Sequence, residues 1–406
     1  MSTPQSERIH IGFFGCRNAG KSSLVNAITG QEMSLVSDIL GTTTDPVSKA
    51  MELLPLGPVL IVDTPGYDDD DEALGASRVG RARRVLAKTD IAVLVAEATR
   101  GIGEVEQELL DLFEELKIPY LIAFSKADLL EDEGNRAQPE RLPSGALAPV
   151  YVSAKTGAGI QLLKDRLASI EVAEGAPLVR DLLSPGDVVV LVTPIDESAP
   201  KGRLILPQVQ TLRDILDADA IGLVVKETEL AGALASLAEP PAMVITDSQA
   251  FAEVAEIVPE DIPLTSFSIL MARHKGFLEE AVEGVVALQS LGEGDSVLVA
   301  EGCTHDRKCN DIATVKIPRW LEKSTGAKVD IQTSTGFDFP QDVSGVRAVV
   351  HCGGCMLNAR EIAHRRAIAR ACGVPFTNYG LAIASMLGIL KRSLSVFPDL
   401  AAKLHS

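Results

Sequence analysis

Two groups of residues in this chain have types and spacings that could do chemistry. Near the N-terminus, a complete G-x4-G-K-S phosphate loop runs Gly15-Cys-Arg-Asn-Ala-Gly-Lys-Ser22. Far downstream stand Cys303-Thr-His305 and then His351-Cys352-Gly-Gly-Cys355. The first pattern is typical of a nucleoside triphosphate site. Thiolates and imidazoles suit zinc and iron–sulfur clusters, so the second pattern predicts a metal centre.

The phosphate loop follows a short apolar run and precedes a helical pattern, as the mechanism of such loops requires. We expect Lys21 to reach the β- and γ-phosphates and Ser22 to bind Mg²⁺. The residues expected to surround the phosphates are Gly15, Asn18, Ala19, Gly20, Lys21, Ser22 and Ser23.

Four further segments follow in the order that guanine specificity requires. They are Gly41-Thr-Thr-Thr-Asp45, Asp63-Thr-Pro-Gly66, Ser125-Lys126-Ala-Asp128 and Ser153-Ala154-Lys155. We expect Thr43 and Asp63 to support Mg²⁺ and the Gly66 N–H to sense the γ-phosphate. Asp128 is suited to accept both guanine N–H donors, and residues 153–155 are placed to contact the guanine carbonyl. The predicted ligands are therefore GTP or GDP with Mg²⁺.

Composition sets the broad class. The chain has 406 residues, 46% of them hydrophobic, and a net charge of −18. That acidity argues against a nucleic-acid partner. We find no apolar segment long enough for a membrane span and no export signal, so we expect a cytoplasmic protein. In a reducing compartment the six cysteines are better metal ligands than disulfides.

Alternating strand and helix patterns predict an α/β fold in three parts. Residues 1–174 indicate a P-loop domain with a doubly wound parallel sheet. Residues 178–273 repeat the α/β pattern without a chemical motif, which favours a small dimerisation domain, and we expect a homodimer. Residues 275–406 form the metal-binding domain. Its strand patterns at 296–301 and 346–350 end next to the two cysteine motifs, where open α/β sheets place ligands.

The metal site has two interpretations on spacing alone. Cys303, Cys352 and Cys355 with His305 or His351 could close a tetrahedral zinc site. The three cysteines alone fit a [4Fe-4S] cluster whose fourth iron is open or weakly held. The spacing does not choose between them.

The first 165 or so residues resemble the GTPases of the TrmE–Era branch. That resemblance implies slow hydrolysis stimulated by K⁺, because Asn18 occupies the position that helps to hold a potassium ion where an arginine finger would act. Tyr67 follows Gly66 in place of a water-orienting glutamine. The implied catalytic residues are Asn18, Lys21, Thr43, Asp63 and Gly66. Ser125 stands where the branch usually has asparagine, which predicts looser support of the guanine site.

Over its whole length the chain resembles the [FeFe]-hydrogenase maturation GTPases, the HydF family. The resemblance rests on C-x-H followed by H-C-x-x-C after a TrmE-like GTPase domain and an intervening domain. It implies a [4Fe-4S] cluster on Cys303, Cys352 and Cys355 with an exchangeable fourth site. It also implies that the chain carries a transient diiron subcluster, built by two radical-SAM maturases, to apo-[FeFe]-hydrogenase. The alternatives are a tRNA-modification GTPase, disfavoured by the acidity, and a metal-insertion GTPase with a zinc site, which should carry histidine-rich tracts.

Overall fold

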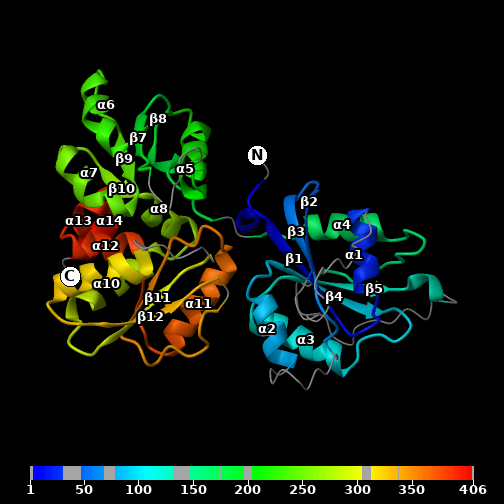
Figure 1. Ribbon diagram of the computed structural model, residues 1–406. Coiled ribbons are helices and arrows are strands. Elements are labelled where there is room, and N and C mark those ends of the chain that lie inside the picture. The colour runs from blue at the N-terminus through cyan, green and yellow to red at the C-terminus, as the bar shows by residue number, and fades with distance from the viewer. Residues whose placement is uncertain are drawn as a thin grey trace. The chain divides into compact units, whose positions relative to one another are not determined.

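The computed structural model describes residues 3–30, 47–67, 78–130, 147–172, 175–195, 204–303, 312–336 and 338–404. The chain divides into two compact units, Met1–Ala173 and Glu174–Ser406. Figure 1 shows the elements of each unit. Within the described ranges, no helix combines the length and the apolar character that a membrane crossing needs.

The first unit is built on a six-stranded sheet in which only β2 runs antiparallel. Long apolar runs form its central strands, as expected for strands buried on both faces. In spatial order the strands are β2 (Val47–Leu53), β3 (Gly57–Asp63), β1 (Ile9–Phe14), β4 (Ile91–Glu97), β5 (Tyr120–Ser125) and β6 (Val150–Tyr151).

Helices cover both faces of this sheet. They are α1 (Lys21–Thr29), α2 (Arg78–Leu86), α3 (Glu104–Glu115) and α4 (Ile160–Ala168). Two separate apolar cores result, and β1 contributes to both: Phe13 belongs to one and Phe14 to the other. The predicted doubly wound P-loop fold is confirmed.

The second unit begins with a four-stranded parallel sheet. Its strands, in spatial order, are β10 (Leu264–Ser266), β9 (Met243–Thr246), β7 (Val188–Val192) and β8 (Ile221–Val225). The connecting helices are α5 (Leu206–Asp217), α6 (Leu230–Ser236) and α7 (Phe251–Ile257). β8 therefore lies at an edge of this sheet.

A second four-stranded parallel sheet follows. Its strands are β12 (Asp330–Ser334), β11 (Ser296–Ala300), β13 (Ala348–His351) and β14 (Phe376–Asn378). Its helices are α10 (Ile317–Thr325), α11 (Ala359–Ala371), α12 (Tyr379–Met386), α13 (Leu390–Ser393) and α14 (Pro398–Lys403). Asn358 caps α11, since its Oδ1 accepts the Glu361 N–H at 3.0 Å.

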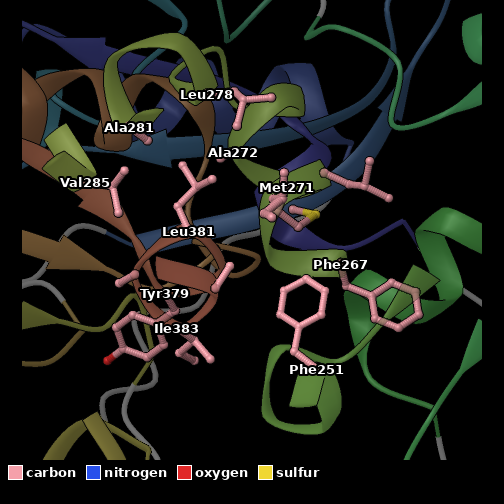
Figure 2. Close-up of a cluster of buried hydrophobic side chains, with 14 of the residues drawn as sticks. Phe251, Phe267, Met271, Ala272, Leu278, Ala281, Val285, Tyr379, Leu381 and Ile383 are labelled. Carbon is pink, nitrogen blue, oxygen red and sulfur yellow. The ribbon is translucent and has the colours of Figure 1, made fainter. Parts of the chain in front are cut away.

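The two sheets of the second unit share one apolar core, which extends from Leu178 to Phe397. Helices α8 (Phe267–His274) and α9 (Leu278–Val285) connect them. Figure 2 shows the part of this core where side chains of α7, α8, α9 and α12 meet. The pattern of residues 264–268 predicts a strand over all five residues, but β10 ends at Ser266, because the Ser266 Oγ accepts the Ile269 N–H and starts α8.

Candidate functional site

The phosphate loop joins β1 to α1 in the first unit. Gly15 has φ +150°, and a Cβ there would stand 2.2 Å from the Val95 carbonyl oxygen, so only glycine fits. Asn18 has a left-handed φ of 60°, and α1 begins at Lys21 directly after Gly20. The N-terminal end of α1 thus lies at the loop, where backbone N–H groups favour an anion.

Lys21, Ser22 and Asp63 come together beside this loop. The Lys21 Nζ donates to the carbonyls of Gly15 and Cys16 at 3.0 and 2.8 Å. The Ser22 Oγ donates to Asp63 Oδ2 at 2.5 Å. Burial raises the pKa of Asp63, although the bond from Ser22 and the charge of Lys21 oppose this. Asp63 Oδ1 is buried and has no hydrogen-bond partner among the described residues, so this carboxylate oxygen is suited to bind Mg²⁺.

The base-recognition segments lie at the ends of β5 and β6. The Ser153 Oγ donates to Asp128 Oδ1 at 2.7 Å, and this bond, more than the charge of Lys155, lowers the pKa of the exposed Asp128. Lys126 has a left-handed φ of 55° and forms an ion pair with Glu97. Asp128 is therefore held as a carboxylate at the surface, as an acceptor of guanine N–H groups must be.

Ser125 has a role that sequence reasoning missed. It is buried, and its Oγ donates to the Ala19 carbonyl at 2.5 Å and lies 3.2 Å from the Ala96 carbonyl. The hydroxyl thus links the base-recognition segment to the phosphate loop. The one sequence signal for this contact is that Ser125 occupies the first position of the motif, where asparagine is usual.

The remaining predicted nucleotide residues are placed as follows. A Cβ on Gly66 would stand 3.0 Å from the Arg17 Cα, so the Asp-Thr-Pro-Gly segment lies against the phosphate loop. Ala19 and Gly20 are within the loop, Ser23 is exposed on α1, and Ala154 and Lys155 follow Ser153. Thr43 lies outside the described residues.

The cysteine motifs follow two neighbouring strands of the last sheet. β11 and β13 pair in parallel with Ala300 opposite His351, so Cys303 and Cys352 emerge at the same sheet edge. Cys352, Gly353, Gly354 and Cys355 form a tight segment, here named the cysteine turn. Gly354 has φ +67°, and a Cβ there would stand 2.7 Å from the Ile362 Cδ1. Glycine is therefore needed in the turn.

The three thiols lie within electrostatic reach of one another. Burial, and then the neighbouring cysteines, raise the pKa values of Cys303 and Cys355 to about 12. Burial also raises the pKa of Cys352, although its Sγ accepts N–H groups from Gly302 at 3.1 Å and Gly354 at 3.4 Å. A metal must therefore displace protons from these thiols when it binds.

The donor set fits an iron–sulfur cluster in its chemistry: three partly buried thiols on one sheet edge, one of them already accepting two N–H groups. Among the described residues, no three His, Cys, Asp or Glu side chains converge as they would on one metal ion. In a four-iron cluster each thiolate binds a different iron, so its ligands do not converge on one point. The segment from 304 to 311, with His305, lies outside the described residues.

His351 is fully buried as the last residue of β13. Its Nδ1 lies 2.7 Å from the Cys352 carbonyl oxygen and its Nε2 lies 3.1 Å from Arg365 Nη1. Burial and the charge of Arg365 lower the pKa of His351 to about 3, so the ring is neutral. Both ring nitrogens are engaged within the protein. His351 is thus beside the cysteines but has no nitrogen directed to them in this conformation.

Two charged residues near the thiols carried no sequence signal. Lys275 follows α8 and is buried, and its charge partly opposes the rise that burial causes in the pKa of the Cys355 thiol. Glu301 is buried after β11, and its charge raises the pKa of Cys303. A Cβ on Gly353 would stand 3.4 Å from the Met271 Cβ, so α8 lies against the cysteine turn. Helix α8, which connects the two sheets of the second unit, therefore packs beside the thiols.

Comparison with known families fits this arrangement. Residues 10–126 match the family model described as 50S ribosome-binding GTPase. The first unit is therefore a P-loop GTPase domain. Residues 178–276 match the hydrogen maturase F dimerization domain, and residues 279–396 match the hydrogen maturase F tetramerization domain. The chain belongs to the hydrogen maturase F (HydF) family.

Individual relatives align with part of this chain. GTPase Der of Wolinella succinogenes is 33% identical over 168 residues, which are 40% of this chain and 36% of the relative. The tRNA modification GTPase MnmE of Neisseria meningitidis is 33% identical over 161 residues, covering 40% and 34%. The chain thus spans about a third of the length of these curated relatives. The crystal structure of Era from Aquifex aeolicus aligns with a TM-score of 0.34 and 21% identity, covering 53% of this chain and 93% of that one.

Proposed function

We propose that this chain is a GTPase of [FeFe]-hydrogenase maturation that holds a [4Fe-4S] cluster and carries a diiron precursor to apo-hydrogenase. The observation that carries this proposal is that Cys303 follows β11 and the cysteine turn follows the neighbouring strand β13, with the three thiols within electrostatic reach, in a chain whose second unit matches hydrogen maturase F domains. A GTPase domain alone would leave the metal centre unexplained.

The GTPase domain supports guanine nucleotide hydrolysis through its own residues. Lys21, now bonded to two loop carbonyls, would neutralise phosphate oxygens, and Ser22 with Asp63 would hold Mg²⁺. Asn18 in the loop would help to hold K⁺. The Tyr67 side chain packs in the apolar core, so it is not available to orient an attacking water. This arrangement supports our expectation of slow intrinsic turnover with K⁺ stimulation.

The cluster would be held by three thiolates, with one iron left for exchangeable ligands. Such a site can bind a second metal fragment without losing its own protein ligands. The diiron precursor would therefore be cargo of this site, supplied by radical-SAM maturases and consumed by apo-hydrogenase. His351 is less suited than the cysteines to hold the fourth iron, since both of its nitrogens have partners.

Edge strand β8 supports a homodimer through the middle sheet. Ile221 and Val224 on this edge are 56% and 37% exposed, although both are apolar. An exposed apolar edge invites pairing with another strand. A two-fold axis at this edge would pair β8 with the β8 of a second copy in antiparallel fashion. The match of residues 178–276 to a dimerization domain agrees with this interface.

The test loads the anaerobically purified chain with iron and sulfide, adds a synthetic diiron complex, removes the excess, and mixes the product with apo-hydrogenase. The expected result is hydrogen evolution that depends on the loaded protein. The matched control is Cys355→Ala treated in the same way, which should give none. Equal activation by the control, or a colourless zinc protein with no cluster absorption after reconstitution, contradicts the proposal.

A further inference from the structure

A chain of buried polar contacts runs from helix α11 to the cysteine turn. Arg365 on α11 is fully buried. Its Nε donates to Glu361 Oε1 at 3.1 Å, its Nη1 donates to His351 Nε2 at 3.1 Å, and its Nη2 donates to the Gly336 carbonyl. The guanidinium also lies over the Phe339 ring, 5.2 Å from the ring centroid. Every side of this cation is therefore fixed by the protein.

These contacts determine which nitrogen of His351 carries the proton. An arginine has donors only, so His351 Nε2 must accept. In a neutral ring the other nitrogen then carries the hydrogen, and Nδ1–H donates to the Cys352 carbonyl at 2.7 Å. The ring also stacks on Phe376, with 5.5 Å between centroids, which restrains its plane. Arg365 thus sets both the tautomer and the direction of His351.

The Cys352 carbonyl belongs to the peptide that starts the cysteine turn. On one side of this carbonyl, the Cys352 N–H donates to the Ala300 carbonyl at 2.8 Å. On the other, the Gly354 N–H points to Cys352 Sγ at 3.4 Å, and Leu357 N–H donates to the Gly354 carbonyl at 3.0 Å. The bond from His351 to the Cys352 carbonyl therefore restrains the peptide group between Cys352 and Gly353. That peptide lies between the two hydrogen-bonded segments that fix the position of the Cys352 sulfur.

We propose that Arg365 is a positioning residue for the cluster ligands, which acts through His351 to hold the cysteine turn, and that His351 is a support of this turn and not an iron ligand. This role in holding cluster ligands rests on the proposed cluster function. The hydrogen bonds from Arg365 to His351 and from His351 to the cysteine turn are present in the protein without metal. It assigns to Glu361 the task of keeping the buried Arg365 charge paired. Supporting residues of this kind change metal affinity about 10- to 100-fold when replaced.

The first experiment measures amide hydrogen exchange in the metal-free full chain. Arg365→Met should speed amide exchange at Gly354 and Leu357 by about tenfold. This is the effect expected when the buried hydrogen bond from Arg365 to His351, which supports the turn, is lost. The matched control is Arg366→Met on the same helix. Arg366 is also largely buried and ion-paired, but its partners are Glu280 and the Gly276 carbonyl. Exchange in the turn should be unchanged in this control.

Arg365→Met leaves Glu361 buried without its partner, so a second variant guards against simple misfolding. The double variant Arg365→Met with Glu361→Leu removes both charges and restores an apolar environment. It should fold, and it should still show fast exchange in the turn, because His351 still lacks its donor. Wild-type exchange in a folded double variant overturns the proposal.

The second experiment concerns the loaded protein. Iron release to a chelator should be about 10- to 100-fold faster in Arg365→Met than in wild type, and unchanged in Arg366→Met. His351→Asn keeps an N–H near the position of Nδ1 and has no nitrogen at the position of Nε2. It should therefore still bind the cluster and keep the nitrogen couplings seen by pulsed electron paramagnetic resonance, although iron release should be as fast as in Arg365→Met because the bond to Arg365 is lost. Loss of a strong nitrogen coupling in His351→Asn would show iron ligation and overturn the proposal.

The two experiments separate this inference from the proposed function. If the chain held no iron–sulfur cluster at all, reconstitution would fail in every variant and in wild type alike. The exchange of the metal-free turn would still decide whether Arg365 holds it through His351.

Discussion

The Ser125 Oγ lies 2.5 Å from the carbonyl oxygen of Ala19, to which it donates a hydrogen bond. Ser125 ends β5, and Ala19 is in the phosphate loop, so one hydroxyl joins the base-recognition side of the nucleotide site to the phosphate side. The serine that departs from the usual asparagine therefore has a structural task that we did not expect from the sequence.

Replacement of Ser125 by alanine should weaken guanine nucleotide binding. The variant leaves the buried Ala19 carbonyl without this donor, which costs about 1 kcal/mol, or roughly a fivefold rise in the dissociation constant. Calorimetric titration with GDP measures the change. Ser125→Asn keeps a side-chain donor and serves as the control, with binding close to wild type. If alanine binds GDP as tightly as serine does, the hydroxyl link has no part in nucleotide affinity.

Asn18 should determine the response to monovalent cations. It lies in the phosphate loop with φ 60°, where its side chain would help to hold K⁺ near the phosphates. We expect GTP hydrolysis by wild type to be at least about tenfold faster in K⁺ than in Na⁺, a small part of what an arginine finger supplies. Steady-state phosphate release in the two salts gives the ratio.

Asn18→Ala should bring the K⁺ to Na⁺ ratio near one while GTP still binds. Lys21→Ala is the contrasting variant, because loss of the phosphate-directed charge should abolish binding in either salt. A potassium response that survives in Asn18→Ala would rule out this residue as the cation's support.

Much of the fold was predictable where apolar runs are buried on both faces. The patterns of residues 9–14, 120–125, 188–192, 221–225 and 243–246 predict strands, and β1, β5, β7, β8 and β9 have these bounds. β12 was missed, because its sequence Asp-Ile-Gln-Thr-Ser has no apolar run and it lies at an edge. β14 was missed because it has only three residues. Edge and very short strands are stabilised by their neighbours, which a local pattern does not contain.

The site was predictable to the extent that its motifs are local. The sequence placed Cys303 and Cys352 after strands, and the parallel pairing of β11 with β13 brings those ends together. The surroundings of His351 were not predictable, since Arg365 is distant in sequence and reaches it only through the packing of α11. Contacts of this kind depend on tertiary structure and leave no spacing signal.

Charges placed on the β8 edge should break the proposed homodimer. In Ile221→Lys with Val224→Lys, two exposed apolar side chains on the edge strand become cations, and pairing of β8 with a second β8 would then bring like charges together at the interface. We expect the mass of the oligomer in sedimentation to fall by half for the full chain. Leu162→Lys on α4 is the control, because it changes an equally exposed apolar residue in the GTPase domain. An unchanged mass in the β8 variant would place the dimer interface elsewhere.

Cys303, Cys352 and Cys355 should each be required to retain iron. Each thiolate would bind a different iron, and alanine removes an anionic ligand that no neutral neighbour replaces. We expect about four iron atoms per chain in wild type and loss of most of them in each alanine variant. Cys372→Ala is the matched control: this thiol is also partly buried in the second unit, but it points to Asp342. GTP turnover should persist in all four variants, because the nucleotide residues belong to a separate compact unit. Iron content and GTP turnover measured on the same preparations test the loss of iron and the persistence of GTPase activity. Full iron retention in Cys352→Ala would refute the ligand assignment.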